Sequence, residues 1–120
     1  MWFNIKELLD ILNGKKTLTI RCFTKKGAMP IKIGSKTYLK TGSFTSKARY
    51  GQIEIISAEI KPLSKMTIQD ALNGGYDSID AYIDEQINIF NPNVDLEHTE
   101  MIFYKFKIIW LDENLIKSLV

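Results

Sequence analysis

The stretch that most constrains the fold is residues 14–21, GKKTLTIR, where apolar and polar side chains begin to alternate. From there to residue 22 every second side chain is apolar, which is the period of a strand with one face toward a core. Thr19 and Arg21 are then expected on the opposite, wetter face, with Lys16 entering from the turn just before them. An ammonium, a hydroxyl and a guanidinium without a neighbouring acid suit a phosphate, a carbonyl oxygen or a base edge.

Four short helices are predicted from capping residues and the apolar stripes that follow them. Side chains that can accept a hydrogen bond at a helix start occur at Asn4, Thr67, Ser78 and Asp112. Glu7 and Asp70 follow the first two caps by three residues, which is the spacing of a capping box or a close variant of it. The first helix is expected to end at Asn13-Gly14 and the third at Asn91-Pro92.

Strands are predicted over residues 17–23, 36–40, 52–60 and 101–111. The apolar parity shifts between Ile55 and Ile56, which predicts a β-bulge. In the last strand, alternate residues from Ile102 to Trp110 are apolar and are expected to share one face. This order of elements predicts an α+β fold, a small mixed β-barrel with helices packed at its side and ends, in a single domain of residues 1–120.

Charge is divided unevenly along the chain. Residues 1–66 carry 13 Lys and Arg against 4 Asp and Glu, whereas residues 67–120 carry 3 against 10. Ten basic residues and no acid lie between Asp10 and Glu54. This polarity indicates either an anionic partner, for which nucleic acid is the usual candidate, or a lysine-rich surface that only aids solubility.

The composition, 45% hydrophobic and 25% charged, predicts a cytoplasmic protein without a membrane partner. No apolar run approaches the ~20 residues that cross a bilayer, and the first residues lack the pattern of a signal peptide. The single cysteine, Cys22, stands in the apolar register of its strand, which favours a buried thiol. His98, the only histidine, stands in an acidic loop, so we expect no metal site and no other cofactor.

Spacing excludes two classes of enzyme. A phosphate-binding loop needs a glycine where Leu9 stands and a Ser or Thr where Lys16 stands. A Ser-His-Asp triad would need His98 as its base, and nothing near it resembles a nucleophile elbow.

A longer pattern, Gly14-x-Lys16-x-x-Thr19-x-Arg21, resembles the signature of the ASCH domain family, a branch of the PUA-like superfamily. Residues 63–71, LSKMTIQDA, followed by residues 75–78, GYDS, are similar to the helical segment of that family. The likeness covers about residues 5–110, although Gly34-Ser35 stands where the family commonly has Gly-Asp. It implies a PUA-like β-barrel with a cleft beside the strand that carries Thr19 and Arg21.

The resemblance also implies a role in RNA binding, and some members of the family cleave RNA. One bacterial branch hydrolyses N4-acetylcytidine with a lysine and a threonine, which Lys16 and Thr19 match, and with a glutamate. That glutamate is not matched, because the corresponding place falls at residues 73–75, NGG. The nearest acids, Asp70 and Asp77, are out of register with it.

Three hypotheses follow. In the first, the protein binds RNA or a nucleotide; the residues expected to hold it are Lys15, Lys16, Thr19, Arg21, Lys40, Lys47, Arg49 and Tyr76, with Lys25 and Lys26 in a loop. Tyr38, Phe44 and Tyr50 lie among these bases and are candidates either to stack on nucleobases or to join the core. In the second, a small hydrolase acts on an acylated cytidine or on RNA with Lys16 and Thr19 as catalytic residues.

In the third, the acidic half of the chain docks on a basic protein partner, whose identity the sequence does not specify. A purely structural role for Lys16, Thr19 and Arg21, holding neighbouring loops together, is the alternative to all three.

Overall fold

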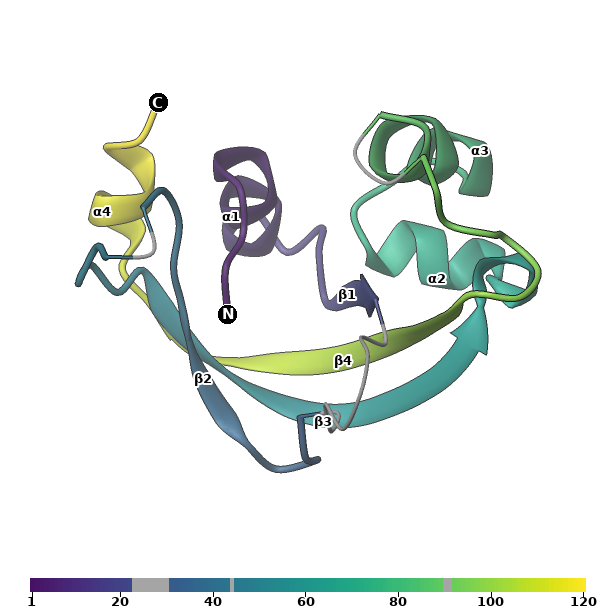
Figure 1. Ribbon diagram of the computed structural model, residues 1–120. Coiled ribbons are helices and arrows are strands. Elements are labelled where there is room, and N and C mark those ends of the chain that lie inside the picture. Colours follow the sequence, from purple (N-terminus) through teal and green to yellow (C-terminus); the bar gives the residue numbers. More distant parts are fainter. Residues whose placement is uncertain (23–30, 44, 90–91) are drawn as a thin grey trace.

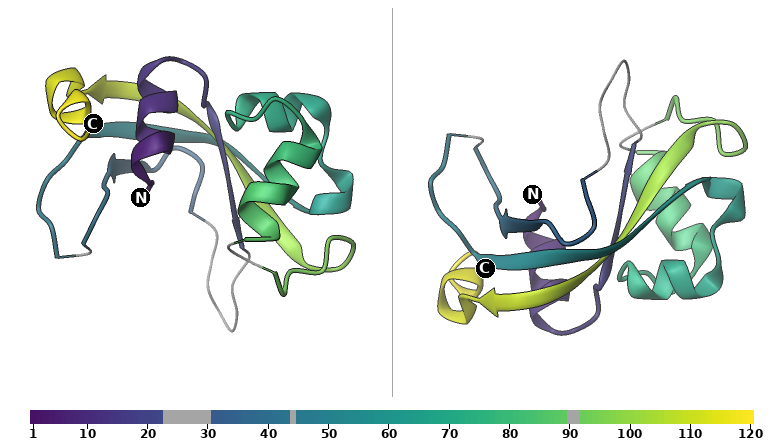
Figure 2. Two further views of the ribbon diagram at one scale, coloured as in Figure 1. Left: turned by 90° about the horizontal axis from the view of Figure 1, so that it is seen from above. Right: turned by 90° about the horizontal axis from the view of Figure 1, so that it is seen from below.

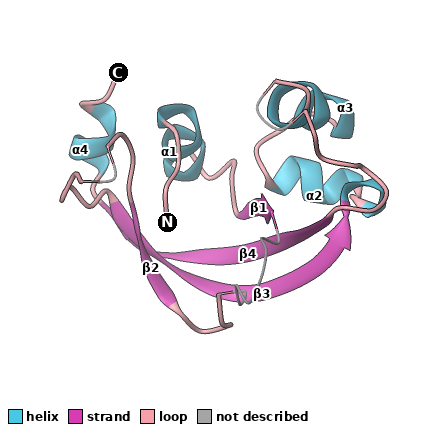
Figure 3. Ribbon diagram, viewed as in Figure 1, coloured by secondary structure: helices cyan, strands magenta, loops and turns pink. Residues whose placement is uncertain are grey.

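The computed structural model describes residues 1–22, 31–43, 45–89 and 92–120. Its centre is an antiparallel sheet of four strands in the order β1-β4-β3-β2. The strands are β1 (Leu18–Cys22), β2 (Lys36–Leu39), β3 (Gly51–Pro62) and β4 (Glu100–Leu111). The long strands β3 and β4 are bent, and the helices lie in a row on their concave side (Figures 1 and 3).

That row contains α1 (Ile5–Leu12), α2 (Ile68–Asn73), α3 (Ile79–Tyr82) and α4 (Glu113–Lys117), with a short 3-10 turn, η1 (Leu63–Lys65), before α2. Seen from above and from below, β1 passes between α1 and the pair α2 and α3 (Figure 2). Helices therefore lie near β1 on two sides, which the sequence did not predict.

The capping residues start the helices as expected. Asn4 accepts the Glu7 N–H at 2.8 Å and the Glu7 carboxylate accepts the Asn4 N–H at 3.1 Å, a complete capping box. Thr67 and Asp70 form a second box at α2. The hydroxyl of Ser78 and the carboxylate of Asp112 accept hydrogen bonds at the starts of α3 and α4.

The third helix differs from the prediction in its geometry. After Tyr82 the chain continues as a π-helical segment, η2 (Ile83–Ile87), rather than as one regular helix. Phe90 and Asn91, at the end of the predicted helix, lie outside the described residues, as does Phe23 at the predicted end of β1.

The sheet confirms the predicted β-bulge and corrects the predicted barrel. The pairing of β3 with β4 shifts register between Ile55 and Ser57, as the change of apolar parity indicates. Within the described parts of the chain, β1 and β2 are the two edges and no strand pairing joins them, so the sheet is open. Closure requires strand pairing between residues far apart in sequence, which local patterns do not reveal.

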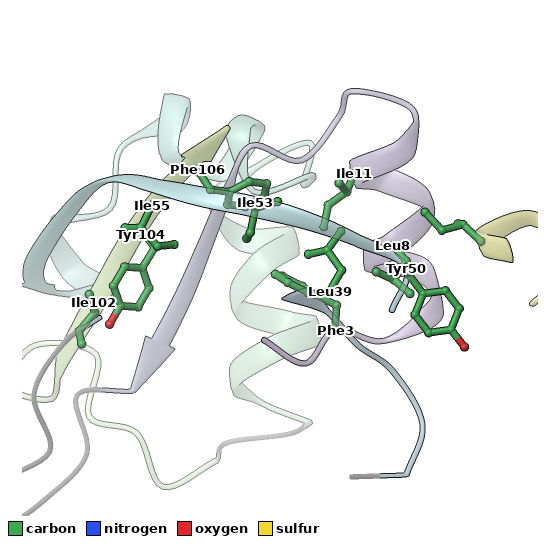
Figure 4. Packing of buried hydrophobic residues seen from close by; sticks show 11 residues of the cluster. Phe3, Leu8, Ile11, Leu39, Tyr50, Ile53, Ile55, Ile102, Tyr104 and Phe106 are labelled. Atoms are coloured by element: carbon green, nitrogen blue, oxygen red, sulfur yellow. The ribbon is translucent and has the colours of Figure 1, made fainter. Parts of the chain in front are cut away.

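Two hydrophobic clusters hold the helices to the sheet. The first lies under α1 and α4 and includes Phe3, Leu8, Ile11, Ile53, Tyr104, Phe106 and Ile116 (Figure 4). The second lies under α2 and α3 and includes Leu18, Leu63, Met66, Tyr76, Tyr82 and Phe103. β4 serves both, because its even-numbered residues 102–106 enter the first cluster while Met101 and Phe103 enter the second.

The expected apolar face of β4 continues in register to Ile108, which pairs with the buried Ile53, but burial along this face ends at Phe106. Ile108 and Trp110 are each 40% exposed. A second register shift, opposite Gln52 and Ile53, interrupts the alternation there. No helix in the described parts of the chain is both long and apolar enough to cross a membrane.

Candidate functional site

A cavity of about 440 Å³ lies beside β1 and is the best candidate for a binding site. Its volume is in the range of small-molecule sites. Three segments line it: the N-terminal segment with the start of α1, β1 with the start of β4, and the α3–η2 helix. The lining residues are Trp2, Asn4, Glu7, Thr19, Ile20, Arg21, Cys22, Tyr82, Gln86 and Met101.

The end of β2 holds the N-terminal segment in place at this cavity. The Phe3 N–H donates to the Lys40 carbonyl at 2.8 Å, and the Lys40 N–H donates to the Met1 carbonyl at 3.0 Å. Between them, Trp2 keeps 39% of its surface exposed while its Nε1–H donates to the Gly42 carbonyl at 2.9 Å. An exposed indole is therefore fixed at the rim of the cavity.

Arg21 is held firmly on the cavity side of β1. Its Nε–H donates to the Thr19 hydroxyl at 3.2 Å and its Nη2–H donates to the Trp2 carbonyl at 2.8 Å. The guanidinium also stacks over the Phe3 ring, 4.8 Å from its centroid. A guanidinium has five N–H donors, so these two bonds leave donor capacity for a ligand.

Thr19 corrects the prediction that its face of β1 is wet. The residue is only 2% exposed, and Trp2, Asn4 and Glu7 from the N-terminal segment and α1 line the cavity beside it. Leu18 and Ile20 pack in the second cluster on the other face, as predicted. Cys22 packs beside them, but it is half-buried rather than buried as predicted, and it also lines the cavity.

Lys16 is only 4% exposed and is not among the residues that line the cavity. Its Nζ donates to the carbonyl of Gly74 at 3.0 Å and lies 3.6 Å from Glu7 Oε2. Burial lowers the pKa of Lys16 from 10.5 to about 8, with nearby Arg21 acting in the same direction and Glu7 opposing it. The amine is therefore partly neutral slightly above neutral pH.

Glu7 is the site residue that sequence reasoning missed. Its position three residues after Asn4 identified it only as a helix cap. In the structure Oε1 completes that cap while Oε2 faces Lys16, and the side chain lines the cavity. No local pattern signals this role, because Glu7 and Lys16 meet only through the turn between α1 and β1.

Tyr76 supports the cavity wall from behind. It is buried, it packs edge-on against Tyr82 with ring centroids 5.2 Å apart, and its hydroxyl accepts a hydrogen bond from Gln86 Nε2 at 2.6 Å. Burial raises the pKa of Tyr76 to about 12, so the phenol stays neutral at physiological pH. Tyr76 thus orients two lining residues rather than lining the cavity itself.

The other predicted ligand-holding residues lie outside this cavity. Lys15, Lys40, Lys47 and Arg49 are exposed, and Arg49 stacks over the Tyr38 ring at 4.1 Å. Tyr50 is buried in the first cluster, which favours the core alternative for that ring. Lys25, Lys26 and Phe44 lie outside the described residues.

A second cavity of about 640 Å³ adjoins the first on the other side of Trp2. The two share Trp2 and Asn4, and the second adds Lys6, Thr41, Ser43 and Ser46 to its walls. Among the described residues, no group of three or more His, Cys, Asp and Glu side chains is placed to hold a metal ion.

Comparison with solved structures places this fold among ASCH domains. The chain superposes on an ASCH domain from Lactobacillus crispatus with a TM-score of 0.69 and 18% identity, covering 86% of this chain and 70% of that one. It superposes on a DUF984 protein from Enterococcus faecalis with a TM-score of 0.65 and 16% identity, covering 90% and 72%. It superposes on an ASCH protein from Zymomonas mobilis with a TM-score of 0.56 and 11% identity, covering 89% of this chain and 64% of that one.

These matches confirm, at the level of the fold, the resemblance that the sequence motifs indicate. The chain shares the fold of these ASCH domain structures, and its own sheet is open within the described residues. No protein-family model matches the sequence, and no curated protein matches it either.

Proposed function

We propose that this protein binds RNA or a nucleotide, with a nucleobase entering the cavity beside Thr19 and Arg21. The observation that carries the proposal is the combination of aromatic and polar groups around one small cavity. Trp2 and Tyr82 contribute aromatic rings to the cavity lining, and base stacking on such rings contributes about 1–3 kcal/mol per base. Arg21 offers N–H donors whose direction is fixed by Thr19 and Trp2.

The exposed basic residues take the supporting role in this proposal. Lys15, Lys40, Lys47 and Arg49 are free to approach phosphates, and such contacts add affinity that falls with salt. Lys16 is too deeply buried for a phosphate contact of this kind. We infer that it instead fixes the relative positions of the Gly74 carbonyl and the Glu7 carboxylate.

The test is fluorescence anisotropy with short labelled single-stranded and hairpin RNAs at two salt concentrations. The variants are Arg21→Ala in the cavity and, as a matched control, Arg49→Ala on the surface; thermal unfolding verifies that both fold. We expect salt-sensitive binding that Arg21→Ala weakens about tenfold or more and Arg49→Ala weakens only slightly. Absence of binding at low salt contradicts the function, and equal binding by Arg21→Ala contradicts the site.

A second candidate is hydrolysis of an acylated cytidine, which the lowered pKa of Lys16 favours. A partly neutral amine can act as a base toward the hydroxyl of Thr19, which is a weak nucleophile until its proton is removed. In the structure each group has another partner, since the Thr19 hydroxyl accepts from Arg21 and the Lys16 amine donates to the Gly74 carbonyl. Thr19 would attack the acetyl carbonyl and form an acetyl ester, the proton taken up by Lys16 would pass to the leaving amine of cytidine, and water would then hydrolyse the ester to release acetate.

This candidate is tested by incubating the folded protein with N4-acetylcytidine and separating the products by chromatography. Cytidine is expected with the wild type and not with Thr19→Val, which keeps the shape of the side chain. Lys16→Met is also expected to release no cytidine. No cytidine from the wild type rules the candidate out.

A further inference from the structure

The fold brings the carboxylate of Glu7 close to basic residues of the acid-free stretch. The acid-free stretch between Asp10 and Glu54 predicts a strongly positive cleft around Lys16 and Arg21. Yet Glu7 lines the same cavity as Arg21, with 19% of its side chain exposed. The cavity is therefore mixed in charge rather than uniformly basic.

The position of the Glu7 carboxylate is set by two partners. Oε1 accepts the Asn4 N–H at 3.1 Å, within the capping box of α1. Oε2 lies 3.6 Å from Lys16 Nζ, which is beyond ordinary hydrogen-bond length. A carboxylate oxygen has two lone pairs, so Oε2 keeps capacity to accept a donor from the cavity side.

The charges at the cavity discriminate between the three ligand groups that the sequence leaves open, namely a phosphate, a carbonyl oxygen and a base edge. Arg21 and Glu7 carry opposite charges at the cavity. Burial lowers the pKa of Arg21, and the attraction of Glu7 is the largest effect that opposes this lowering. A phosphate brought into this space would be attracted by Arg21 but repelled by Glu7 at close range. An uncharged base edge meets no such repulsion, and it satisfies the acid and the base at once if it carries both a donor and an acceptor.

We propose that Glu7 determines the specificity of this cavity, selecting an uncharged nucleobase edge that carries an N–H donor beside a carbonyl oxygen. The Glu7 carboxylate accepts the N–H, Arg21 donates to the carbonyl oxygen, and the ring stacks on Trp2 or Tyr82. Phosphate groups remain outside the cavity, toward the exposed lysines. The inference rests on the proposed binding function and adds the group that is recognised.

The experiment measures affinities of nucleosides by isothermal titration calorimetry, with pairs of ligands in which methylation removes the donor. The pairs are uridine with 3-methyluridine and guanosine with 1-methylguanosine. For the wild type we expect at least one parent nucleoside to bind about tenfold or more tightly than its methylated partner. Sodium phosphate at constant ionic strength is expected not to compete with it.

The protein side of the test is Glu7→Gln, with Glu113→Gln as the matched control. Gln retains an acceptor for the Asn4 N–H, so α1 keeps its cap, and circular dichroism verifies the fold. Glu113 lies on α4, where it pairs with Lys117 and does not line the cavity. We expect Glu7→Gln to reduce the preference for the parent nucleoside about tenfold and to admit phosphate as a competitor, while Glu113→Gln changes neither.

The outcomes separate this inference from the function on which it rests. If the wild type binds no nucleoside and no RNA, the proposed function is wrong and the inference falls with it. If the wild type binds but does not distinguish the methylated ligands, the function stands and the role of Glu7 is wrong. The same conclusion follows if Glu7→Gln keeps the selectivity of the wild type.

Discussion

Two lysines contact opposite ends of α2, and their surroundings shift their pKa values in opposite directions. Near the start of the helix, Lys61 Nζ lies 2.8 Å from Asp70 Oδ2 and 2.7 Å from Glu59 Oε1. At its end, Lys16 Nζ contacts the Gly74 carbonyl and one carboxylate 3.6 Å away.

Burial disfavours the charged form of both amines, but only Lys61 has enough anionic partners to reverse the effect. Its hydrogen bonds to Asp70 and Glu59 raise the pKa of Lys61. The pKa of Lys16 falls to about 8, because burial outweighs the attraction of Glu7. The pairing at Lys61 therefore stabilises the fold. The charge at Lys16 destabilises the fold, yet the lysine is retained beside the cavity.

The largest expected effect is the dependence of stability on pH at Lys16. Between pH 8 and 10.5 the unfolded chain holds this proton and the folded chain has released it, so the free energy of unfolding rises with pH. The gap between 10.5 and about 8 corresponds to about 3 kcal/mol. Urea unfolding at pH 7 and pH 10.5 is expected to show this rise for the wild type relative to Lys16→Met, and parallel profiles contradict it.

An intermediate effect of the opposite sign is expected at Lys61. Lys61→Met is expected to lower the free energy of unfolding by about 2 kcal/mol at pH 7, because the buried Asp70 carboxylate loses a charged hydrogen-bond partner. The raised pKa means that this stabilisation is complete below about pH 10.5 and is lost at higher pH. Urea unfolding at pH 7 and 11 measures it; a variant as stable as the wild type at pH 7 would remove the contrast with Lys16.

The smallest effect is expected at an ion pair outside the comparison, Glu113 with Lys117 on α4. Both side chains are 60% exposed, although the oxygen and nitrogen lie only 2.6 Å apart. Exposed pairs at this helical spacing contribute about 0.3–0.5 kcal/mol, so Glu113→Gln is expected to change the free energy of unfolding by less than about 1 kcal/mol. Thermal unfolding measures it, and a larger loss would mean that distance rather than burial governs these pairs.

Local patterns predicted the elements well because caps, turns and alternation act over a few residues. The capping box of Asn4 and Glu7 and the β-bulge after Ile55 both depend on near neighbours in the chain. The same patterns failed at Thr19, whose polarity predicted a wet face, because the N-terminal segment beside it is far from it in sequence. They also failed to predict that the sheet is open and that burial along the apolar face of β4 ends at Phe106.

The sequence by itself determined the caps, the strands, the polarity of charge and the clustering of Lys16, Thr19 and Arg21 around one strand. Only the tertiary structure decided what surrounds that cluster. The contact of Lys16 with Gly74 spans 58 residues and that of Arg21 with Trp2 spans 19, so neither follows from local spacing. Burial and the proximity of Glu7 then set the charge of the cavity, because the energy of a charged group depends on what lies next to it in space rather than in sequence.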